Sequence, residues 1–296
     1  MLPINSFGVV AFSEHPHLHD VIARIADWSC RQGVSVTFHP FLAPTAPKGS
    51  SIASDDKAVA ASSDAVISVG GDGTFLSVAH LCRFTQKPVI GINLGGLGFL
   101  TDIGPENLEE SLEKIKAGNY SIISRMVLEA CLRRGDSKIC RFNALNDIFI
   151  NRINIPKLAS ISAWYGDDFI ADFNADGLIV ASPSGSTAYS LSCGGPIVEP
   201  NVNAMLLTPI CPHSLSERPL VLPATKPIRL RINERNPDLL LCADGLDSAK
   251  LQGNDEITVS CVGGTNLIQL AEQSYFSLLR TKLSWGTVAK RSGNRP

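Results

Sequence analysis

The residues with the clearest chemical potential are an aspartate and its glycine neighbours, in the run Gly70-Gly71-Asp72-Gly73-Thr74. Glycine has no Cβ, so a glycine-rich backbone approaches a bulky anion such as a polyphosphate closely. A carboxylate in such a loop repels the anion, and its presence therefore needs a chemical reason. It either accepts a proton from a hydroxyl nucleophile or helps to hold Mg²⁺, and both uses predict phosphoryl transfer. A surface Gly-Asp-Gly turn is the competing interpretation.

The elements expected on either side of this run favour the phosphate site over a plain turn. Residues 65–69 form a short apolar and β-branched run, which predicts a strand buried on both faces. Apolar residues from 75 to 81 recur at helical spacing, and we expect Thr74 to cap that helix. The free N–H groups and the positive end of the helix dipole would then face the loop.

The first 120 residues alternate between predicted strands and helices. Four strands are expected at 7–12, 34–39, 65–69 and 88–93, with helices at 18–29, shortly before 65, at 75–81 and at 105–117. This alternation predicts a parallel α/β sheet, where ligands bind beyond the carboxyl ends of the strands. The glycine-rich turn 95–98 also follows a strand, so we expect it beside the first turn. Residues 40–51 are expected to form a mobile surface loop.

After residue 120 the predicted helices give way to short strands. Eleven are expected, at 121–133, 139–145, 148–151, 158–165, 169–172, 178–181, 204–208, 228–232, 239–242, 257–262 and 267–270. They predict a mostly antiparallel β domain over 121–270. Residues 275–283 carry a helical apolar face, and we expect the tail 271–296 to return to the first domain, 1–120.

Composition limits the classes of function. The 296 residues suit two domains, and 26 basic against 28 acidic side chains give no electrostatic argument for nucleic acid or an anionic membrane. No run approaches the ~20 apolar residues of a transmembrane helix, and no signal peptide is recognisable, so we expect a soluble, cytoplasmic protein. The eight cysteines lie singly and are expected to be reduced core thiols.

Two polar stretches in the second half suit nucleotide recognition. Asn146-Asp147 offers an amide beside a carboxylate, as base or ribose binding requires, although a plain turn explains the pair equally well. Residues 176–196 run from a strand into a loop rich in hydroxyls, suited to a diphosphate or a ribose, and Tyr189 offers a flat surface for a ring. A polar turn is the alternative there. A serine hydrolase is disfavoured because no Gly-x-Ser-x-Gly elbow is present.

Several other residues have more than one interpretation. His15, His17 and His19 are expected to be solvated at a helix start, since no carboxylate or cysteine nearby completes a metal site. His213 and Arg218, in the proline-rich segment 208–219, are structural or contact a ligand or a second subunit. Asp244-Gly245 is either a turn or a ligand contact.

Several of these stretches, taken together and in order, resemble the bacterial NAD kinases. The resemblance covers about residues 65–250 and is carried by 70–74, 91–101, 144–147, 176–196, 209–219 and Asp244-Gly245. Gly-Gly-Asp-Gly-Thr alone is shared with diacylglycerol, sphingosine and phosphofructo-type kinases, whereas 176–196 together with Pro212-His213-Ser214-Leu215 is far more specific.

The resemblance implies ATP-dependent phosphorylation, with Mg²⁺, of the 2′-hydroxyl of the adenosine ribose of NAD, giving NADP. Asp72 would be the general base, and the loop Gly70, Gly71, Asp72, Gly73 and Thr74 would face the triphosphate. The residues implied to hold NAD are Gly73, Asn146, Asp147, Asp176, Thr187, Ala188, Tyr189, Ser190, Leu191 and Ser192, with Lys157 and Asn174 as peripheral contacts. No side chain is assigned as a metal ligand. The resemblance also implies a homodimer or homotetramer assembled through the β domain.

This chain departs from the family pattern at three positions, and two other functions compete. Asp147 stands where Glu is frequent, Ser184 where Thr is usual, and Leu246 where Gln often follows Asp-Gly. A lipid or sphingoid-base kinase would share the acidic glycine loop but would need an apolar acceptor pocket in place of the polar 184–189 loop. A module that binds NAD without turnover is the non-catalytic alternative.

Overall fold

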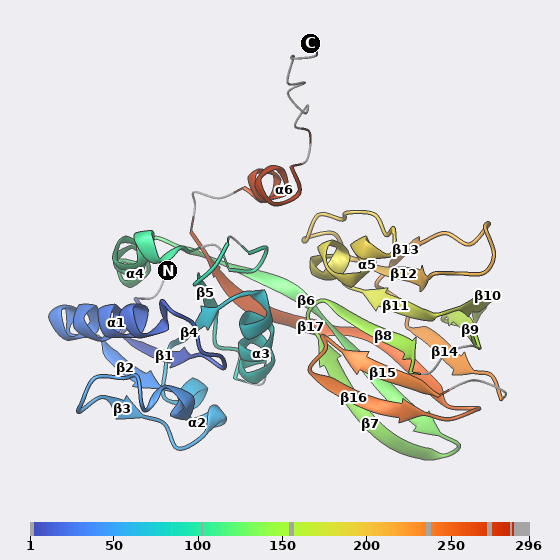
Figure 1. The fold of residues 1–296 in the computed structure, drawn as a ribbon, viewed down its shortest axis with the longest axis horizontal. Coiled ribbons are helices and arrows are strands. Elements are labelled where there is room, and N and C mark those ends of the chain that lie inside the picture. The colour runs from blue at the N-terminus through green and yellow to red at the C-terminus, as the bar shows by residue number, and fades with distance from the viewer. Residues whose placement is uncertain are drawn as a thin grey trace, which may run out of the picture. The chain divides into compact units, whose positions relative to one another are not determined.

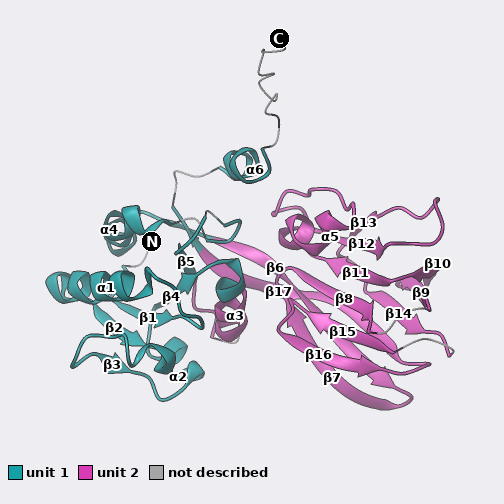
Figure 2. Cartoon of the chain, viewed as in Figure 1, with its two compact units in different colours: residues 1–75, 89–122, 268–296 teal, residues 76–88, 123–267 magenta. Residues whose placement is uncertain are grey.

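The computed structural model describes residues 3–83, 85–96, 98–101, 103–153, 157–234, 238–270, 274–284 and 286. The chain divides into two compact units (Figure 2). Unit 1 comprises Met1–Phe75, Val89–Ile122 and Ile268–Pro296, and unit 2 comprises Leu76–Pro88 and Ile123–Leu267.

Unit 1 contains a parallel sheet. Its strands are β1 (Ser6–Val10), β2 (Ser35–Phe38), β3 (Ser51–Ile52), β4 (Ala65–Gly70) and β5 (Val89–Asn93). They lie in the order β5-β4-β1-β2-β3, and every pair is parallel (Figure 1). All residues of β4 and β5 are buried, which their apolar and β-branched composition predicts.

The helices of unit 1 are α1 (Leu18–Gln32), α2 (Asp56–Ala61), the first turn of α3 (Asp72–Cys82), α4 (Leu108–Lys116) and α6 (Tyr275–Leu283), with 3₁₀ turns η1 (Pro40–Leu42) and η2 (Pro105–Asn107). Helices α1 and α4 pack on one face of the sheet and α2 on the other. Phe7 and Val9 of β1 share a buried core with α1 and α4. Gly8 faces the opposite side of the sheet, where an added Cβ would lie 2.6 Å from Val59 of α2.

The prediction of a surface loop at 40–51 is correct for residues 43–50 but misses the elements at either end. The segment begins with η1 and leads into the edge strand β3, so residues 65–70 form the fourth strand in chain order and not the third. Leu42 is fully buried, and His39, also buried, bonds Asp56 at 2.7 Å and accepts the N–H of Phe41. The bond to Asp56 and the burial of Leu42 join this segment to other parts of the chain, which local propensity does not report.

Unit 2 consists of two mostly antiparallel sheets. Strands β13 (Leu220–Pro223), β12 (Ala204–Ile210), β11 (Gly177–Ala181), β8 (Asp147–Arg152), β15 (Leu239–Ala243) and β16 (Asp247–Leu251) form one, in that order. Strands β10 (Asp168–Ala175), β9 (Ala159–Tyr165), β14 (Ile228–Ile232) and β17 (Glu256–Gln269) lie in the other, with β6 (Ser121–Arg134) paired to β17 and to β7 (Ser137–Ala144). Inward residues of both sheets form one core, and a turn η3 (Ser184–Thr187) with the short α5 (Tyr189–Ser192) covers the opposite face of β11 and β12.

The predicted fold class, a parallel α/β domain followed by a mostly antiparallel β domain, is confirmed, and the second domain differs from the prediction in some strands. Strands β13 and β16 were not predicted, because their residues are mostly polar or exposed at sheet edges. The two strands expected at 257–262 and 267–270 are one strand, which passes through Gly263 at φ +112°. That positive φ needs glycine, so the glycines mark an irregularity within the strand and not its end.

The cysteines and the histidine cluster are placed in part as expected. All eight cysteines are free thiols, but only Cys82 and Cys242 are buried, and Cys30 and Cys211 are exposed, so the core prediction is wrong for most of them. Residues 15–19 lie at the start of α1, with His17 as its N-cap. In the described part of the chain, no group of three or more His, Cys, Asp or Glu residues is placed to hold a metal, and no helix is long and apolar enough to cross a membrane.

Candidate functional site

The acidic glycine turn of unit 1 connects β4 to α3. The strand ends at Gly70 and the helix begins at Asp72, with the N–H of Phe75 donating to the carbonyl of Gly71 at 3.0 Å. Thr74 therefore lies inside the first turn of α3, and its prediction as the helix cap is wrong. Its side chain lies against Gly70, where a Cβ would be 2.4 Å from Oγ1 of Thr74.

The backbone of this turn is open where a phosphate would approach. Gly71 and Gly73 are exposed, and a Cβ added at either would meet no atom within 4 Å. Together with the N-terminal end of α3, they offer backbone N–H groups and a positive dipole end to an anion. Because Gly73 lies within the first turn of the helix, residues 71–73 combine the open glycine backbone with the positive end of the helix dipole. This is the part of the loop suited to phosphate.

The carboxylate of Asp72 is held by the second glycine-rich turn. Its Oδ2 accepts the backbone N–H of Phe99 at 2.9 Å, and its Oδ1 accepts the N–H of Leu100 at 3.2 Å and the hydroxyl of Thr101 at 2.9 Å. The prediction that the two glycine-rich turns lie beside each other is thus confirmed within unit 1. These bonds fix the position of the carboxylate at the start of α3.

In unit 2, the pair Asn146-Asp147 lies where β8 begins. The backbone N–H groups of Leu145, Asn146 and Asp147 all donate to the carboxylate of Asp244, at 2.7, 2.9 and 2.9 Å. Asp244 and Gly245 have φ of +50° and +70° in the hairpin turn between β15 and β16. Asp244-Gly245 is therefore a turn whose carboxylate fixes the backbone beside Asp147.

The side chain of Asp147 is buried beside a second carboxylate. Only 4% of Asp147 is exposed. Burial, and then the charge of Asp244, raise the pKa of the Asp147 carboxyl to about 7, while the N–H of Tyr189 works in the opposite direction. Burial also raises the pKa of the Asp244 carboxyl. Near neutral pH the Asp147 carboxyl can therefore act as a hydrogen-bond donor or acceptor, which suits a ribose hydroxyl.

The hydroxyl-rich loop 182–192 folds onto the same backbone. The N–H of Ser182 donates to the carbonyl of Asn146 at 2.8 Å, and a Cβ at Gly185 would lie 2.1 Å from that oxygen. Tyr189 is half-buried, and its ring meets Phe149 edge to face at 5.2 Å. The loop thus brings Asn146, Asp147 and Tyr189 together within unit 2.

The other predicted site residues differ in their burial and in their contacts. Ser190 is fully buried, and its hydroxyl bonds that of Thr208 at 2.8 Å, which ties the loop to β12. Asp176 forms an ion pair with Arg152 at 2.9 Å. Among the remaining predicted contacts, the half-buried ones are Thr187, Ala188 and Leu191, and the exposed ones are Lys157, Asn174 and Ser192.

Two residues with clear roles in these clusters had no role predicted from the sequence. Thr101 lies at the end of the glycine-rich stretch 91–101, and a threonine shortly after such a turn is a usable signal. Phe149 was read only as a strand residue. Phe149 contacts Tyr189, and Thr101 binds Asp72. Both partners are far away in the sequence, so local patterns do not predict these contacts.

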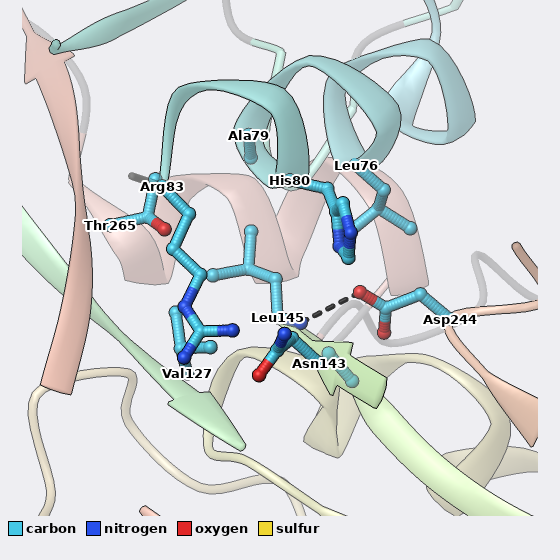
Figure 3. Close-up of a pocket in the computed structure, with 10 residues that line it drawn as sticks. Leu76, Ala79, His80, Arg83, Val127, Asn143, Leu145, Asp244 and Thr265 are labelled. Atoms are coloured by element: carbon cyan, nitrogen blue, oxygen red, sulfur yellow. Dashed lines mark hydrogen bonds between the residues drawn. The ribbon is translucent and has the colours of Figure 1, made fainter. Parts of the chain in front are cut away.

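The residues of unit 2 also line a small pocket (Figure 3). In the close-up, His80 of α3 extends toward Asp244, and the dashed line marks the bond from Leu145 to that carboxylate. The pocket is too small for a nucleotide, and its polar lining residues are His80, Arg83, Asn143, Asp244 and Thr265.

Comparison with known proteins agrees with this arrangement. Residues 7–120 match the family model for the ATP-NAD kinase N-terminal domain, and residues 145–270 match that for the ATP-NAD kinase C-terminal domain. An NAD kinase of Caldanaerobacter subterraneus subsp. tengcongensis is 47% identical over 223 residues, covering 75% of this chain and 79% of that protein. An NAD kinase of Syntrophotalea carbinolica is 38% identical over 281 residues, covering 94% of this chain and 98% of that protein.

Solved structures show the same fold. The crystal structure of yeast NADH kinase complexed with NADH has a TM-score of 0.87 and 28% identity, covering 98% of this chain and 91% of that one. The crystal structure of an NAD kinase from Archaeoglobus fulgidus in complex with ATP has a TM-score of 0.72 and 26% identity, covering 94% of this chain and 98% of that one.

The fold, the acidic glycine turn and these matches place the chain among the phosphotransferases that combine an α/β domain with a β domain. Its relatives over nearly the full length share one name. The chain belongs to the NAD kinase family. The matches give no support to the lipid or sphingoid-base kinase alternative.

Proposed function

We propose that this protein transfers the γ-phosphoryl group of ATP to the 2′-hydroxyl of the adenosine ribose of NAD, giving NADP and ADP. The observation that carries the proposal is the Asp72 carboxylate, fixed by three hydrogen bonds next to the exposed glycines 71 and 73 at the start of α3. A carboxylate held beside an anion-binding turn is what an alcohol phosphotransferase needs. The names of the relatives, and the NADH and ATP in the two solved structures, supply the substrates.

In this proposal the two predicted domains have different roles. The α/β domain, 1–120 with 271–296, binds the triphosphate at the 70–74 turn, and the β domain, 121–270, binds NAD at the cluster of Asn146, Asp147 and Tyr189. Asp147 is suited to the ribose and the Tyr189 ring to a base, while the backbone around Gly185 is suited to a diphosphate. Thr187, Ala188 and Leu191, with Lys157, Asn174, Asp176 and Ser192, are proposed as outer contacts.

The reaction requires a proton acceptor and a place for negative charge. The 2′-hydroxyl gives its proton to Asp72 as its oxygen bonds to the γ-phosphorus. Because a carboxylate is a weak base at neutral pH, we expect the proton to transfer late, when the hydroxyl oxygen has lost electron density to phosphorus. Most of the rate enhancement then comes from positioning and from the donors around the phosphates.

A magnesium ion fits the proposal as a companion of ATP. The described residues hold no cluster of three candidate metal ligands, and the Asp72 carboxylate already accepts three hydrogen bonds. Mg²⁺ is commonly held by substrate phosphates and water with few protein ligands. It would neutralise charge on the phosphates, and the residues of this chain would position the two substrates.

The direct test is formation of NADP from NAD, ATP and Mg²⁺ by the purified protein. An Asp72→Asn variant should lose about 10²–10⁴-fold in kcat and keep its affinity for NAD, since a general base contributes about that much. Asp167→Asn, a change of an exposed aspartate in the turn between β9 and β10, is the matched control and should keep full activity. Binding of NAD without NADP formation by the wild type would point instead to a non-catalytic NAD-binding module.

We also propose that the protein works in the cytoplasm as a homodimer or homotetramer assembled through the β domain. The edge strand β13 exposes Leu220 and Val221, which are 37% and 49% accessible, and an edge strand with exposed apolar residues favours pairing with another chain. Light scattering of the purified protein should give a mass of two or four chains, and a monomer would contradict this part of the proposal.

A further inference from the structure

We propose that Thr101 is a positioning residue for Asp72, and that the turn around it leaves Oδ2 of Asp72 as the atom that accepts the ribose proton. The inference rests on the proposed function, and it adds a named atom and a supporting residue that the family match does not specify. All of its residues lie within unit 1.

The two carboxylate oxygens of Asp72 accept different numbers of hydrogen bonds. A carboxylate oxygen accepts about two hydrogen bonds. Among the described residues, Oδ1 accepts two, from Leu100 N–H at 3.2 Å and from the Thr101 hydroxyl at 2.9 Å. Oδ2 accepts one, from Phe99 N–H at 2.9 Å. Oδ1 is therefore filled, and Oδ2 keeps one acceptor position for a substrate hydroxyl.

The direction of the Thr101 hydroxyl is set by Asn93. The Asn93 side-chain nitrogen donates to Oγ1 of Thr101 at 2.8 Å and to the carbonyl of Gly96 at 2.8 Å, while its oxygen accepts the N–H of Gly95 at 2.9 Å. A flipped amide would place oxygen against the Gly96 carbonyl, so the assignment is determined by the contacts. Because Thr101 receives a donor from Asn93, its single proton points to Asp72.

Thr101 is itself held rigidly against β5. It is fully buried, its carbonyl accepts the N–H of Gly98 at 3.0 Å, and residue 103 pairs with Ile92. A Cβ at Gly91 would lie 2.8 Å from Cα of Thr101, so glycine at 91 makes room for it. Through these contacts, strand β5 fixes the position and direction of the Thr101 hydroxyl.

The turn also requires glycine at position 98. A Cβ there would lie 2.0 Å from Oδ1 of Asp72 and 2.2 Å from Oγ1 of Thr101. A side chain at 98 would therefore displace the carboxylate or break its bond to the hydroxyl. Both residues support the hydrogen bond between Thr101 and Asp72, because Gly98 leaves room for the Asp72 carboxylate and Thr101 supplies the hydroxyl donor.

The proton transfer that follows from this arrangement balances in atoms and charge. The O–H bond of the ribose 2′-hydroxyl breaks, and its proton goes to Oδ2 of Asp72, which becomes a neutral carboxylic acid. The 2′-oxygen forms the new bond to the γ-phosphorus. The bond from that phosphorus to the β–γ bridging oxygen breaks, and ADP leaves with the electron pair.

The experiment compares Thr101→Val, which keeps the shape and removes the hydroxyl, with Thr101→Ser, which keeps the hydroxyl. We expect Val to lower kcat about 10- to 100-fold with KM for NAD and ATP changed less than about 3-fold, because small misplacements of a reacting group cost about this much. Ser should restore kcat to within about 3-fold of the wild type. Thr265→Val, at a buried threonine of unit 2, is the control and should keep full activity.

A double variant separates positioning from a general structural role. If Thr101 acts through Asp72, then Thr101→Val should lower kcat no further in the Asp72→Asn background, because the two changes remove the same contribution. Unchanged kcat in Thr101→Val, equal loss in the Val and Ser variants, or a full additional loss in the double variant would overturn the inference alone. A wild-type protein that makes no NADP would overturn the proposed function and the inference together.

Discussion

Asp147 and Asp244 are joined by two hydrogen bonds that run in opposite directions. The N–H of Asp147 donates to the Asp244 carboxylate at 2.9 Å, and the N–H of Asp244 donates to the carbonyl of Asp147 at 2.9 Å. The β15–β16 hairpin turn thereby fixes the first residue of β8, which lies 97 positions earlier in the chain. The proposed ribose contact thus depends on a residue that need not touch NAD.

The first prediction concerns the removal of that carboxylate. Asp244→Asn leaves one oxygen for three backbone donors and places an amide N–H opposite the N–H of Leu145. We expect a loss of about 1–3 kcal/mol in the free energy of unfolding, the usual cost of an unsatisfied buried donor, and a higher KM for NAD. Urea unfolding and steady-state kinetics measure the two effects.

Asp247→Asn provides the matched control for Asp244→Asn. Asp247 is a partly exposed aspartate of the next strand, and its ion pair with His80 is long at 3.9 Å. We expect its change to alter the free energy of unfolding by less than about 0.5 kcal/mol. Equal effects of the two variants would contradict a special role for the Asp244 carboxylate.

The second prediction concerns the pH dependence of stability. The pKa of the Asp147 carboxyl is raised from its usual 3.8 to about 7, so between these values the folded protein keeps a proton that the unfolded chain has lost. The contribution of Asp147 to the free energy of unfolding is therefore largest below pH 3.8 and falls as the pH rises toward 7, by at most about 1.4 kcal/mol per pH unit.

Asp147→Asn isolates this contribution because the amide stays neutral at every pH. Urea unfolding without ligands from pH 4.5 to 7.5 should show a smaller loss of stability with rising pH in the variant than in the wild type. The raised pKa of Asp244 leaves the variant with some pH dependence of its own. Parallel curves for the two proteins would show that Asp147 does not titrate in this range.

The third prediction concerns the ring contact behind the proposed base-binding surface. Phe149→Leu removes the edge-to-face contact with Tyr189 and lets that ring turn. We expect KM for NAD to rise about 3- to 10-fold with little change in KM for ATP. Phe169→Leu removes a similar contact, with Trp164 at 5.5 Å, and should leave both KM values unchanged. An equal rise in KM for both substrates would exclude a specific role for the Phe149 ring.

The fourth prediction contrasts two glycines. A Cβ at Gly185 would lie 2.1 Å from the carbonyl oxygen of Asn146, whereas a Cβ at Gly71 meets no atom within 4 Å. Gly185→Ala should therefore lower the free energy of unfolding by about 1–3 kcal/mol and raise KM for NAD. Gly71→Ala should keep the stability of the wild type and raise KM for ATP, because only the approach of the phosphate is hindered. Calorimetry and steady-state kinetics of both variants measure these effects.

The element types and the chemistry of the glycine loop were readable from the sequence. The buried strand before Gly70, the helix after it and the change to short strands after residue 120 all follow from apolar spacing, which is a local property. Thr74 was misread as a cap because the helix start was inferred from residue preference alone. In the structure the helix begins at Asp72, and the carboxylate of that first residue is bound by residues 99–101.

What the sequence by itself determined was therefore the parallel and antiparallel halves and the identity of the acidic turn. Only the tertiary structure decided which groups bind the two carboxylates: Thr101 for Asp72, 29 residues away, and the backbone of 145–147 for Asp244, 97 to 99 residues away. Every residue except proline carries a backbone N–H. The residue types in a sequence therefore do not show which N–H groups a carboxylate will bind. Their identity appears only when the chain has folded and brought them within hydrogen-bond distance.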